Sequence, residues 1–260
     1  MLRPLLETLT RRYVIRRRLP ARHGGARLYV SPSAGLKYLF RSMKHIDPTL
    51  CALAEQLVHA GSVVWDVGAN IGLFCFAAAH HAGPQGYVVA FEPDIWLVGL
   101  LRRSSAQQPA SSASVQIVPT AVAASCDLRQ FNIAARSRAA SFLTGYGSSQ
   151  SGGAREEQTV IATSLDWLAQ RLPGPDVLKI DVEGAELEVL KGAAHLLREK
   201  RPVLVCEVSL ENSTAVTSLL TACGYSVYDG EANPPHRESL RAAPWTTVAI
   251  PNRSRGADLK

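Results

Sequence analysis

The sequence predicts an α/β fold in which a mostly parallel sheet carries helices on both faces. From residue 63 onward, short runs rich in β-branched residues alternate with helical patterns, as expected of successive β-α-β units. The 260 residues, 47% of them hydrophobic, suffice for one such domain with a full core. No apolar run has the length that a membrane-spanning helix needs, so we expect no membrane span.

Seven segments have the composition of strands. They are residues 63–67, 87–92, 115–118, 177–181, 203–208, 225–229 and 246–250. Helices are predicted after Gly72 as far as the "HAGPQG" turn and at about 94–108, 184–192 and 213–223, mostly with glycine at their ends. Residues 134–158, rich in Ser, Gly, Ala and Arg, read as a mobile insertion.

The charge of the chain is concentrated near its start. Residues 1–41 hold ten Lys and Arg against one Glu, a net charge of +9 in a chain of +6, so the remainder carries −3. Such a basic arm attracts nucleic acid, anionic lipid or an acidic substrate, or it is a solvated basic face that packs on the domain; both interpretations stay open.

The cysteines and the first residues indicate the compartment. Five cysteines are scattered without a C-x-x-C pair, which argues against a disulfide framework and a zinc site. Arginines interrupt the first twenty residues, so no signal peptide is predicted. We expect a cytoplasmic protein; the sequence predicts no oligomeric state.

The stretch "SVVWDVGANIGLF" (62–74) places a glycine turn after the first strand of the main domain. In a dinucleotide site a glycine stands where Asn70 stands here, and Asp66 would repel a phosphate but attract a cation. S-adenosylmethionine, which has a positive centre, an amino-acid end and a ribose but no phosphate, satisfies these features. The turn residues predicted to bind it are Gly68, Ala69, Asn70 and Gly72, with Asp66 acting on the ammonium group directly or through water.

Two further segments complete the predicted cofactor site. Glu92 ends the second strand, twenty residues after Gly72, where an acid can accept hydrogen bonds from both ribose hydroxyls. Pro93 fixes the turn that follows. Adenine is expected near Thr120 and Ala121 after the third strand, through backbone contacts.

Carboxylates also follow the fourth and fifth strands. The carboxyl ends of neighbouring parallel strands line one crevice, so Asp181, Glu183 and Glu207 should face the methyl acceptor. A general base for an alcohol, a Mg²⁺ site and simple stabilisation of a helix N-terminus can each explain them. We assign the three as catalytic residues, with Asp181 also near the cofactor, and assign no metal ligand.

With these residues in view, the chain resembles the FkbM family of S-adenosylmethionine-dependent methyltransferases. The matching segments are "DVGANIG", "AFEPD", "TSLDWL", "LKIDVEGAELEVLKGA" and "PVLVCEVS", within residues 62–209. The resemblance implies a class I methyltransferase sheet of order 3-2-1-4-5-7-6 with an antiparallel last strand, and cofactor contacts at Asp66, Gly68, Asn70, Gly72, Glu92 and Asp181. Thr120 departs from the "NAA" or "NAL" that is usual in the family.

The resemblance also implies methyl transfer mostly to oxygen, here to a hydroxyl of a small-molecule, saccharide or natural-product acceptor by in-line displacement. We expect residues 1–50 to form a basic extension covering the active site, residues 51–251 the methyltransferase domain, and residues 252–260 a tail. The alternative functions are methylation of RNA or another polyanion held by the arginine-rich arm, and an NAD-dependent oxidoreductase.

Overall fold

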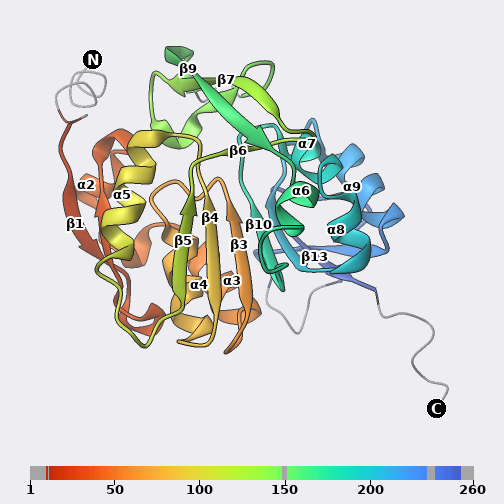
Figure 1. The fold of residues 1–260 in the computed structure, drawn as a ribbon, viewed down its shortest axis with the longest axis horizontal. Helices are drawn as coiled ribbons and strands as arrows, with labels where there is room; N and C mark the ends of the chain where they lie inside the picture. The colour runs from red at the N-terminus through yellow and green to blue at the C-terminus, as the bar shows by residue number, and fades with distance from the viewer. Residues whose placement is uncertain (1–9, 11, 148–150, 233–237, 253–260) are drawn as a thin grey trace.

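A seven-stranded sheet forms the centre of the computed structural model, which describes residues 10, 12–147, 151–232 and 238–252 (Figure 1). Its order is β12-β13-β11-β10-β3-β4-β5, and β13 is antiparallel to both of its neighbours. The strands are β3 (Val63–Val67), β4 (Tyr87–Phe91), β5 (Ser114–Val118), β10 (Val177–Ile180), β11 (Val203–Glu207), β12 (Tyr225–Asp229) and β13 (Thr246–Pro251). The predicted seven strands and their order are confirmed.

Helices cover both faces of this sheet. They are α2 (Lys37–Phe40), α3 (Pro48–Leu57), α4 (Leu73–Ala82), α5 (Ile95–Ser105), α6 (Leu165–Ala169), α7 (Glu186–Lys191), α8 (Ala194–Glu199) and α9 (Ser213–Ala222). Successive side chains of β3 point to opposite faces, so Val64 packs into the core with α4 and α5, whereas Trp65 packs into the core with α6 to α9. Among the described residues, none of the helices has the length and apolar composition to span a membrane.

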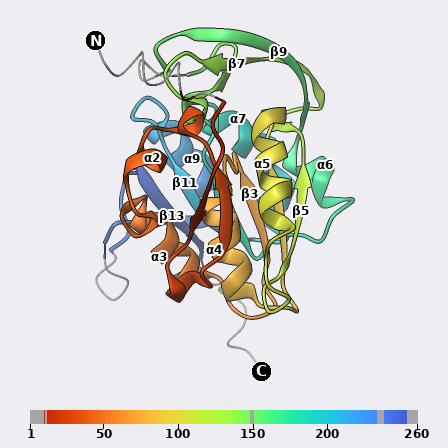
Figure 2. The same ribbon diagram turned by 90° about the vertical axis from the view of Figure 1, so that its left-hand side faces the viewer.

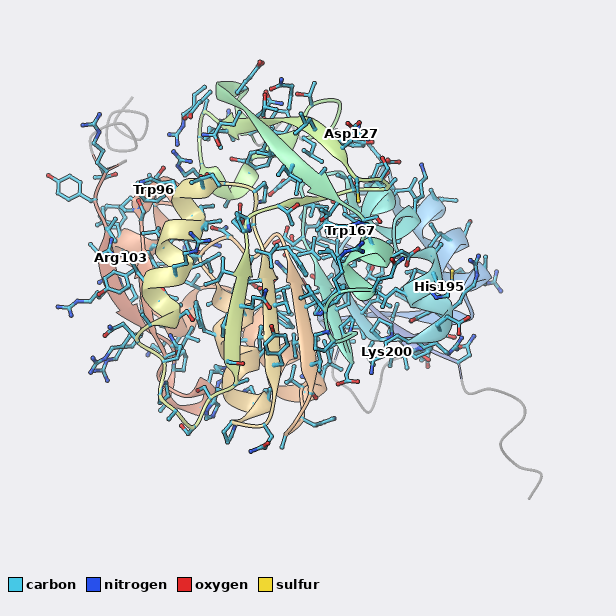
Figure 3. All side chains as sticks on the ribbon, viewed as in Figure 1. Trp96, Arg103, Asp127, Trp167, His195 and Lys200 are labelled. Atoms are coloured by element: carbon cyan, nitrogen blue, oxygen red, sulfur yellow. The ribbon has the colours of Figure 1, made fainter. Side chains whose placement is uncertain are left out.

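The segment before residue 50 packs against the domain. β1 (Ile15–Arg18) and β2 (Arg27–Val30) form an antiparallel hairpin joined by the short 3-10 helix η1 (Ala21–His23). Leu28 and Val30 are fully buried in the core that contains α4 and α5, and Arg103 of α5 covers the Tyr29 ring at 4.1 Å (Figure 3). Residues on both sides of the expected boundary at 50 therefore share one core. Arg3 and Arg11 of the basic arm, and the tail beyond residue 252, lie outside the described residues.

A second sheet of four strands lies above the carboxyl ends of the main strands (Figures 1 and 2). Its order is β6-β9-β7-β8, with β6 (Ala121–Val122), β7 (Asp127–Ala134), β8 (Phe142–Leu143) and β9 (Ala154–Thr163). Residues 134–158, predicted to be a mobile insertion, contribute strands to this sheet, because Phe142–Leu143 of β8 and the first half of β9 pair with β7. We call residues 121–163 the cap; residues 148–150 within it lie outside the described residues.

Candidate active site

The glycine turn after β3 runs against the end of β10. Gly68 has φ of +73°, and a Cβ there would lie 1.8 Å from the carbonyl oxygen of Asp181. Gly72 has φ of +86°, and a Cβ there would lie 2.4 Å from the Phe76 ring. Both positions therefore require glycine for conformation and for space, and the turn is tight as predicted.

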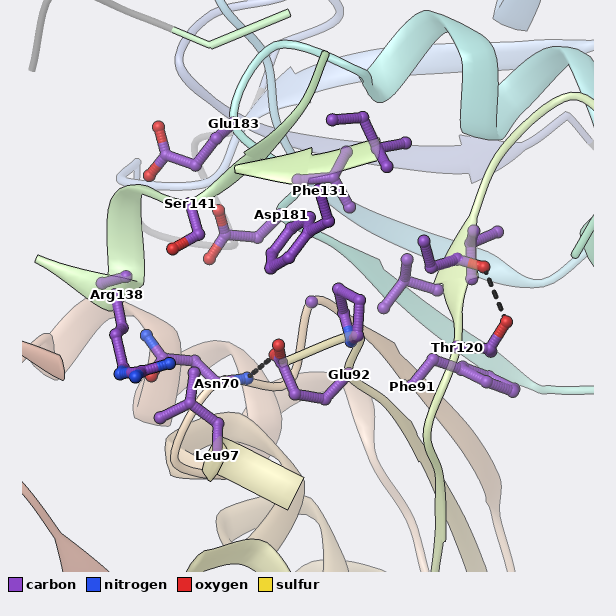
Figure 4. A pocket seen from close by; sticks show the side chains of 18 residues that line it. Asn70, Phe91, Glu92, Leu97, Thr120, Phe131, Arg138, Ser141, Asp181 and Glu183 are labelled. Atoms are coloured by element: carbon purple, nitrogen blue, oxygen red, sulfur yellow. Dashed lines mark hydrogen bonds between the residues drawn. The ribbon is translucent and has the colours of Figure 1, made fainter. Parts of the chain in front are cut away.

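Asn70 stands at the tip of this turn in the left-handed region, with φ of +53°. Its backbone N–H donates to Glu92 Oε2 over 2.8 Å (Figure 4). Its side-chain Oδ1 is buried in the pocket lining and has no hydrogen-bond partner among the described residues. A buried acceptor without a donor is costly, so this oxygen suits a ligand that carries an N–H or O–H group.

Glu92 follows β4 and lies on the wall of the same pocket. Its side chain is 4% exposed, and its two oxygens accept from the backbone N–H groups of Asn70 and Asp94 over 2.8 and 2.9 Å. Burial raises the pKa of the Glu92 carboxyl to about 8, although these backbone donors lower it. Each carboxylate oxygen keeps a second lone pair, so Glu92 can still accept hydrogen bonds from neighbouring hydroxyls.

Asp66 lies beneath the pocket rather than in its lining. It is fully buried; Oδ2 accepts from the backbone N–H of Cys75 over 3.1 Å, and Oδ1 lies 3.0 Å from Lys179 Nζ. Burial raises the pKa of Asp66, and the Lys179 ammonium opposes that rise. This burial disfavours the predicted direct contact of Asp66 with a cofactor ammonium group, since Asp66 here binds Lys179 and the start of α4.

Lys179 connects the turn to the acids, and the sequence reasoning gave it no role. It is 3% exposed, donates to the Gly68 carbonyl over 2.8 Å and lies 3.4 Å from Asp181 Oδ2. Burial lowers its pKa, but Asp66 and Asp181 outweigh burial and raise it. The signal for this role was available in the strand register, which pairs Lys179 with Asp66.

The cap completes the pocket above the turn. The pocket encloses about 570 Å³, part of it open to solvent. Phe131 of the cap faces Glu92 across it (Figure 4), and Arg138 and Leu143 of the cap also line it. The sequence reasoning missed Arg138 and Leu143 because they lie in the insertion that was expected to be mobile, and it missed Phe131 because that residue lies outside every predicted helix and strand. The pocket is lined by Val67, Gly68, Asn70, Phe91, Glu92, Pro93, Leu97, Thr120, Ala121, Val122, Phe131, Arg138, Ala139, Ser141, Leu143, Asp181, Val182 and Glu183.

Thr120 and Ala121, beside which adenine was predicted to bind, both line the pocket. The Thr120 hydroxyl bonds to the carbonyl oxygens of Ala121 and Ile161 over 2.9 and 3.0 Å, so it is already engaged in the cap. The apolar side chains of Val122, Phe131 and Leu143 line this part of the pocket. Ala69, by contrast, is absent from the lining of this pocket but lines the cavity on the other side of the turn.

An ion pair fixes the cap to the helix that follows Glu92. Asp94 caps α5 by accepting from the Trp96 N–H over 2.9 Å, and its other oxygen pairs with Arg138. The Arg138 guanidinium also lies 5.2 Å from the centre of the Trp96 ring, at the cap end of α5 (Figure 3). Arg138 belongs to the short 3-10 helix η4 (Arg138–Ala140), which this contact holds over the pocket.

The three predicted catalytic acids come together beside this pocket. Asp181, Glu183 and Glu207 all line an inner cavity of about 600 Å³ and an outer cavity of about 1170 Å³. Asp181 and Glu183 line the cofactor pocket as well. Lys37 and Asp47 from the N-terminal segment also line the inner cavity.

The crowding of these acids changes their protonation. Burial, followed by the charges of Asp181 and Glu186, raises the pKa of Glu183 to about 7. Burial, followed by Asp181, raises the pKa of Glu207 to about 8. Carboxyls that titrate near neutral pH are suited to acid-base work. Within the described part of the chain, no group of three or more His, Cys, Asp or Glu side chains is arranged to hold a metal ion.

Comparison with known proteins agrees with this geometry. The family model described as "Methyltransferase FkbM domain" matches residues 66–227. The hexuronic acid methyltransferase AglP of Haloferax volcanii is 30% identical over 145 residues, which are 55% of this chain and 54% of that protein. The chain thus matches about half the length of this relative.

Solved structures with some likeness to the chain include the following two. A methyltransferase FkbM from Methylobacillus flagellatus is 15% identical, with 76% of this chain and 49% of the other covered at a TM-score of 0.44. Aeropyrum pernix fibrillarin in complex with S-adenosylmethionine is 13% identical, with 85% and 77% covered at a TM-score of 0.46. Because the family model spans more than half of the sequence, the chain belongs to the FkbM methyltransferase family, and its cofactor is S-adenosylmethionine.

Proposed function

We propose that the protein transfers the methyl group of S-adenosylmethionine to a hydroxyl of a saccharide acceptor by in-line displacement. The observation that carries this proposal is the meeting of Asp181 and Glu183 at the junction of the cofactor pocket with both cavities. A hydroxyl placed there has a carboxylate beside it and the methyl donor next to it. The name of the Haloferax volcanii relative, a hexuronic acid methyltransferase, supports a saccharide acceptor.

The pocket residues fit the cofactor group by group. Asn70 Oδ1, a buried acceptor that lacks a donor, is the residue we assign to the ammonium end. Glu92 is assigned to the ribose hydroxyls, and the slot of Val122, Phe131 and Leu143 to the adenine ring. The bound cofactor supplies a methyl group on a positively charged sulfur, which makes that methyl electrophilic.

The acid we assign as general base is Glu183. An alcohol must lose its proton as its oxygen bonds to the methyl carbon, and a base with a pKa near the working pH is the most effective acceptor of that proton. The pKa of Glu183 is about 7, and its side chain lines the cofactor pocket and both cavities. Glu207 lines the two cavities but not the cofactor pocket, so we assign it to acceptor positioning.

Methylation of RNA or another polyanion is the less favoured alternative, although Arg12, Arg16 and Arg18 of the basic arm are exposed. The Arg17 side chain donates to the carbonyl oxygens of Tyr38 and Leu39 over 3.0 and 2.9 Å, so this arginine is engaged within the protein. The carboxylates that line both cavities would repel phosphate groups. A cytoplasmic location remains part of the proposal, supported by five free cysteines, four of them buried.

The direct test is methyl transfer from isotope-labelled S-adenosylmethionine to a panel of saccharides, read by mass spectrometry with the full chain. We expect a labelled methyl ether on a sugar hydroxyl, which survives mild alkali. A methyl ester, which alkali would cleave, or label on none of the saccharides despite cofactor binding by calorimetry, would contradict the proposal.

A further inference from the structure

The outer cavity has a lining that differs from that of the cofactor pocket. It begins at Asp181 and Glu183 and extends along the carboxyl end of β11. Its rim carries two aromatic side chains, Trp245 and Tyr146, which are 53% and 36% exposed. Its space of about 1170 Å³ includes open solvent, and about 450 Å³ of it can hold water molecules, which is within the usual size range of small-molecule sites.

Backbone hydrogen bonds fix the two segments that carry these aromatic residues. The Trp245 carbonyl accepts from the N–H of Val208, and the following residue, Thr246, pairs with Glu207 across β11 and β13. Trp245 therefore precedes the residue that pairs with Glu207, a predicted catalytic acid. Tyr146 comes from the cap, where its N–H donates to the Leu143 carbonyl. One aromatic ring of the cavity thus comes from the residue just before β13, and the other comes from the cap.

The charges of this cavity have one sign. Its acidic lining residues are Asp181, Glu183, Glu186, Glu207 and Glu211, and its lining contains no Lys, Arg or His among the residues that the structure describes. Glu186 is engaged, since it accepts from the Gly184 N–H and the Asn212 side chain. Asp181 is paired with Lys179 through Oδ2, whereas Glu183, Glu207 and Glu211 can accept hydrogen bonds from hydroxyl or ammonium groups. Above about pH 8, where Glu183 and Glu207 are ionised as well, a carboxylate in the same space would meet like charges, and such contacts are strongly unfavourable.

We propose that the outer cavity is the acceptor subsite and that it takes a sugar ring without an acidic group, either neutral or amino-bearing. The ring stacks on Trp245 and its hydroxyls donate to the carboxylates, an arrangement that uses both kinds of lining residue. This inference rests on the proposed function and narrows it. A sugar ring without an acidic group differs from hexuronic acid, the acceptor in the name of the Haloferax volcanii relative.

The chemistry of the transfer agrees with an alcohol acceptor. The hydroxyl oxygen forms a bond to the methyl carbon while the carbon–sulfur bond breaks and its electron pair goes to sulfur. The hydroxyl proton passes to the Glu183 carboxylate. A carboxylate acceptor is already deprotonated and would need neither this base nor the neighbouring acids.

Binding without turnover tests the subsite directly. Saturation-transfer NMR is measured on the full chain with S-adenosylhomocysteine, comparing methyl glycosides of glucose, glucosamine and glucuronic acid at low salt. We expect the glucoside and the glucosaminide to bind. The glucuronide should bind at least about tenfold more weakly, and this difference in affinity should shrink as salt is added. Equal or tighter binding of the glucuronide, or binding of none of the three, would overturn the inference.

Two variants with matched controls separate stacking from charge. Trp245→Ala should abolish ring binding and leave the affinity for S-adenosylhomocysteine unchanged, while Trp167→Ala, at a half-buried tryptophan on α6, should change neither. Glu211→Gln should strengthen glucuronide binding, while Glu199→Gln at the end of α8 should not. Unchanged ring binding in Trp245→Ala would refute the subsite.

The two proposals fail in different ways. If a saccharide is methylated on a hydroxyl but the glucuronide is bound as well as the glucoside, the subsite is wrong and the proposed function stands. If no saccharide carries a labelled methyl ether, the proposed function itself is wrong.

Discussion

Replacement of Lys179 by methionine tests the charge arrangement beneath the cofactor pocket. The change removes a buried ammonium that lies 3.0 Å from Asp66 Oδ1 and donates to Gly68 over 2.8 Å, and keeps a side chain of similar length. Asp66 is then a fully buried acid without its cation. Breaking such a pair costs about 3–5 kcal/mol of unfolding free energy. In a protein of this size that loss corresponds to a fall in Tm of roughly 6–20 °C.

A surface pair provides the control. Lys200 lies 2.9 Å from Asp176, with both side chains nearly half exposed, so Lys200→Met should cost less than about 1 kcal/mol. Urea unfolding of both variants gives the comparison, and Asp66→Asn combined with Lys179→Met should recover part of the loss. Equal losses from Lys179→Met and Lys200→Met would refute this account of the buried pair.

The pH dependence of Lys179→Met gives a second criterion. Without the ammonium, the pKa of buried Asp66, which burial already raises, rises further. A carboxyl whose folded pKa exceeds its unfolded pKa contributes stability at low pH that is lost as the pH rises through the folded value. The deficit of the variant should therefore be smaller at about pH 5 than at about pH 8, and a deficit independent of pH would contradict the reasoning.

Three further predictions concern the cofactor, the base and the N-terminal segment. Glu92→Ala should lose about 1.5–3 kcal/mol of cofactor affinity, or about 10- to 150-fold, when the affinity is measured by calorimetry. Unchanged affinity would show that Glu92 does not bind the cofactor. The turnover rate should rise as the pH passes through about 7, where Glu183 ionises, and this rise should be absent in Glu183→Gln; a variant that keeps the rise would exclude Glu183 as the base. Burial, followed by Arg22, lowers the pKa of His23, which lies 3.3 Å from His81. The lowered pKa favours the neutral form of His23 in the folded protein. The contribution of His23 to stability is therefore present above the ordinary histidine pKa and is lost as the pH falls. Acid should therefore destabilise the wild type more than His23→Gln in urea unfolding, whereas exposed His195→Gln should follow the wild type.

The main sheet could be predicted because its central strands are buried on both faces. β10 is buried at every position and is apolar except for Lys179, close to the continuous apolar runs that are typical of such strands. The turn residues Gly68 and Gly72 could be predicted as well, since a tight turn with positive φ favours glycine. For these elements the local sequence and the tertiary environment make the same demand.

The cap and the N-terminal hairpin could not be predicted from pattern alone. β9 is exposed or half-exposed over most of its length, so it lacks an apolar alternation, and its polar composition resembles that of a loop. β1 reads "IRRR", which suggests a charged arm, yet it pairs in register with β2. The role of Lys179 depends on the register between β10 and β3, which pairs it with Asp66; the strand order was predicted, but the register was not.

The enclosure of the cofactor pocket has a kinetic consequence. The cap closes the pocket from above through Arg138 and Asp94, and Asp181 and Glu183 form the side shared with the acceptor cavities. A sugar seated at those two acids would obstruct that side. Turnover should then follow a compulsory sequence, with the methyl donor loaded first and the demethylated nucleoside released last. Product inhibition by S-adenosylhomocysteine would be competitive toward the donor and noncompetitive toward the sugar.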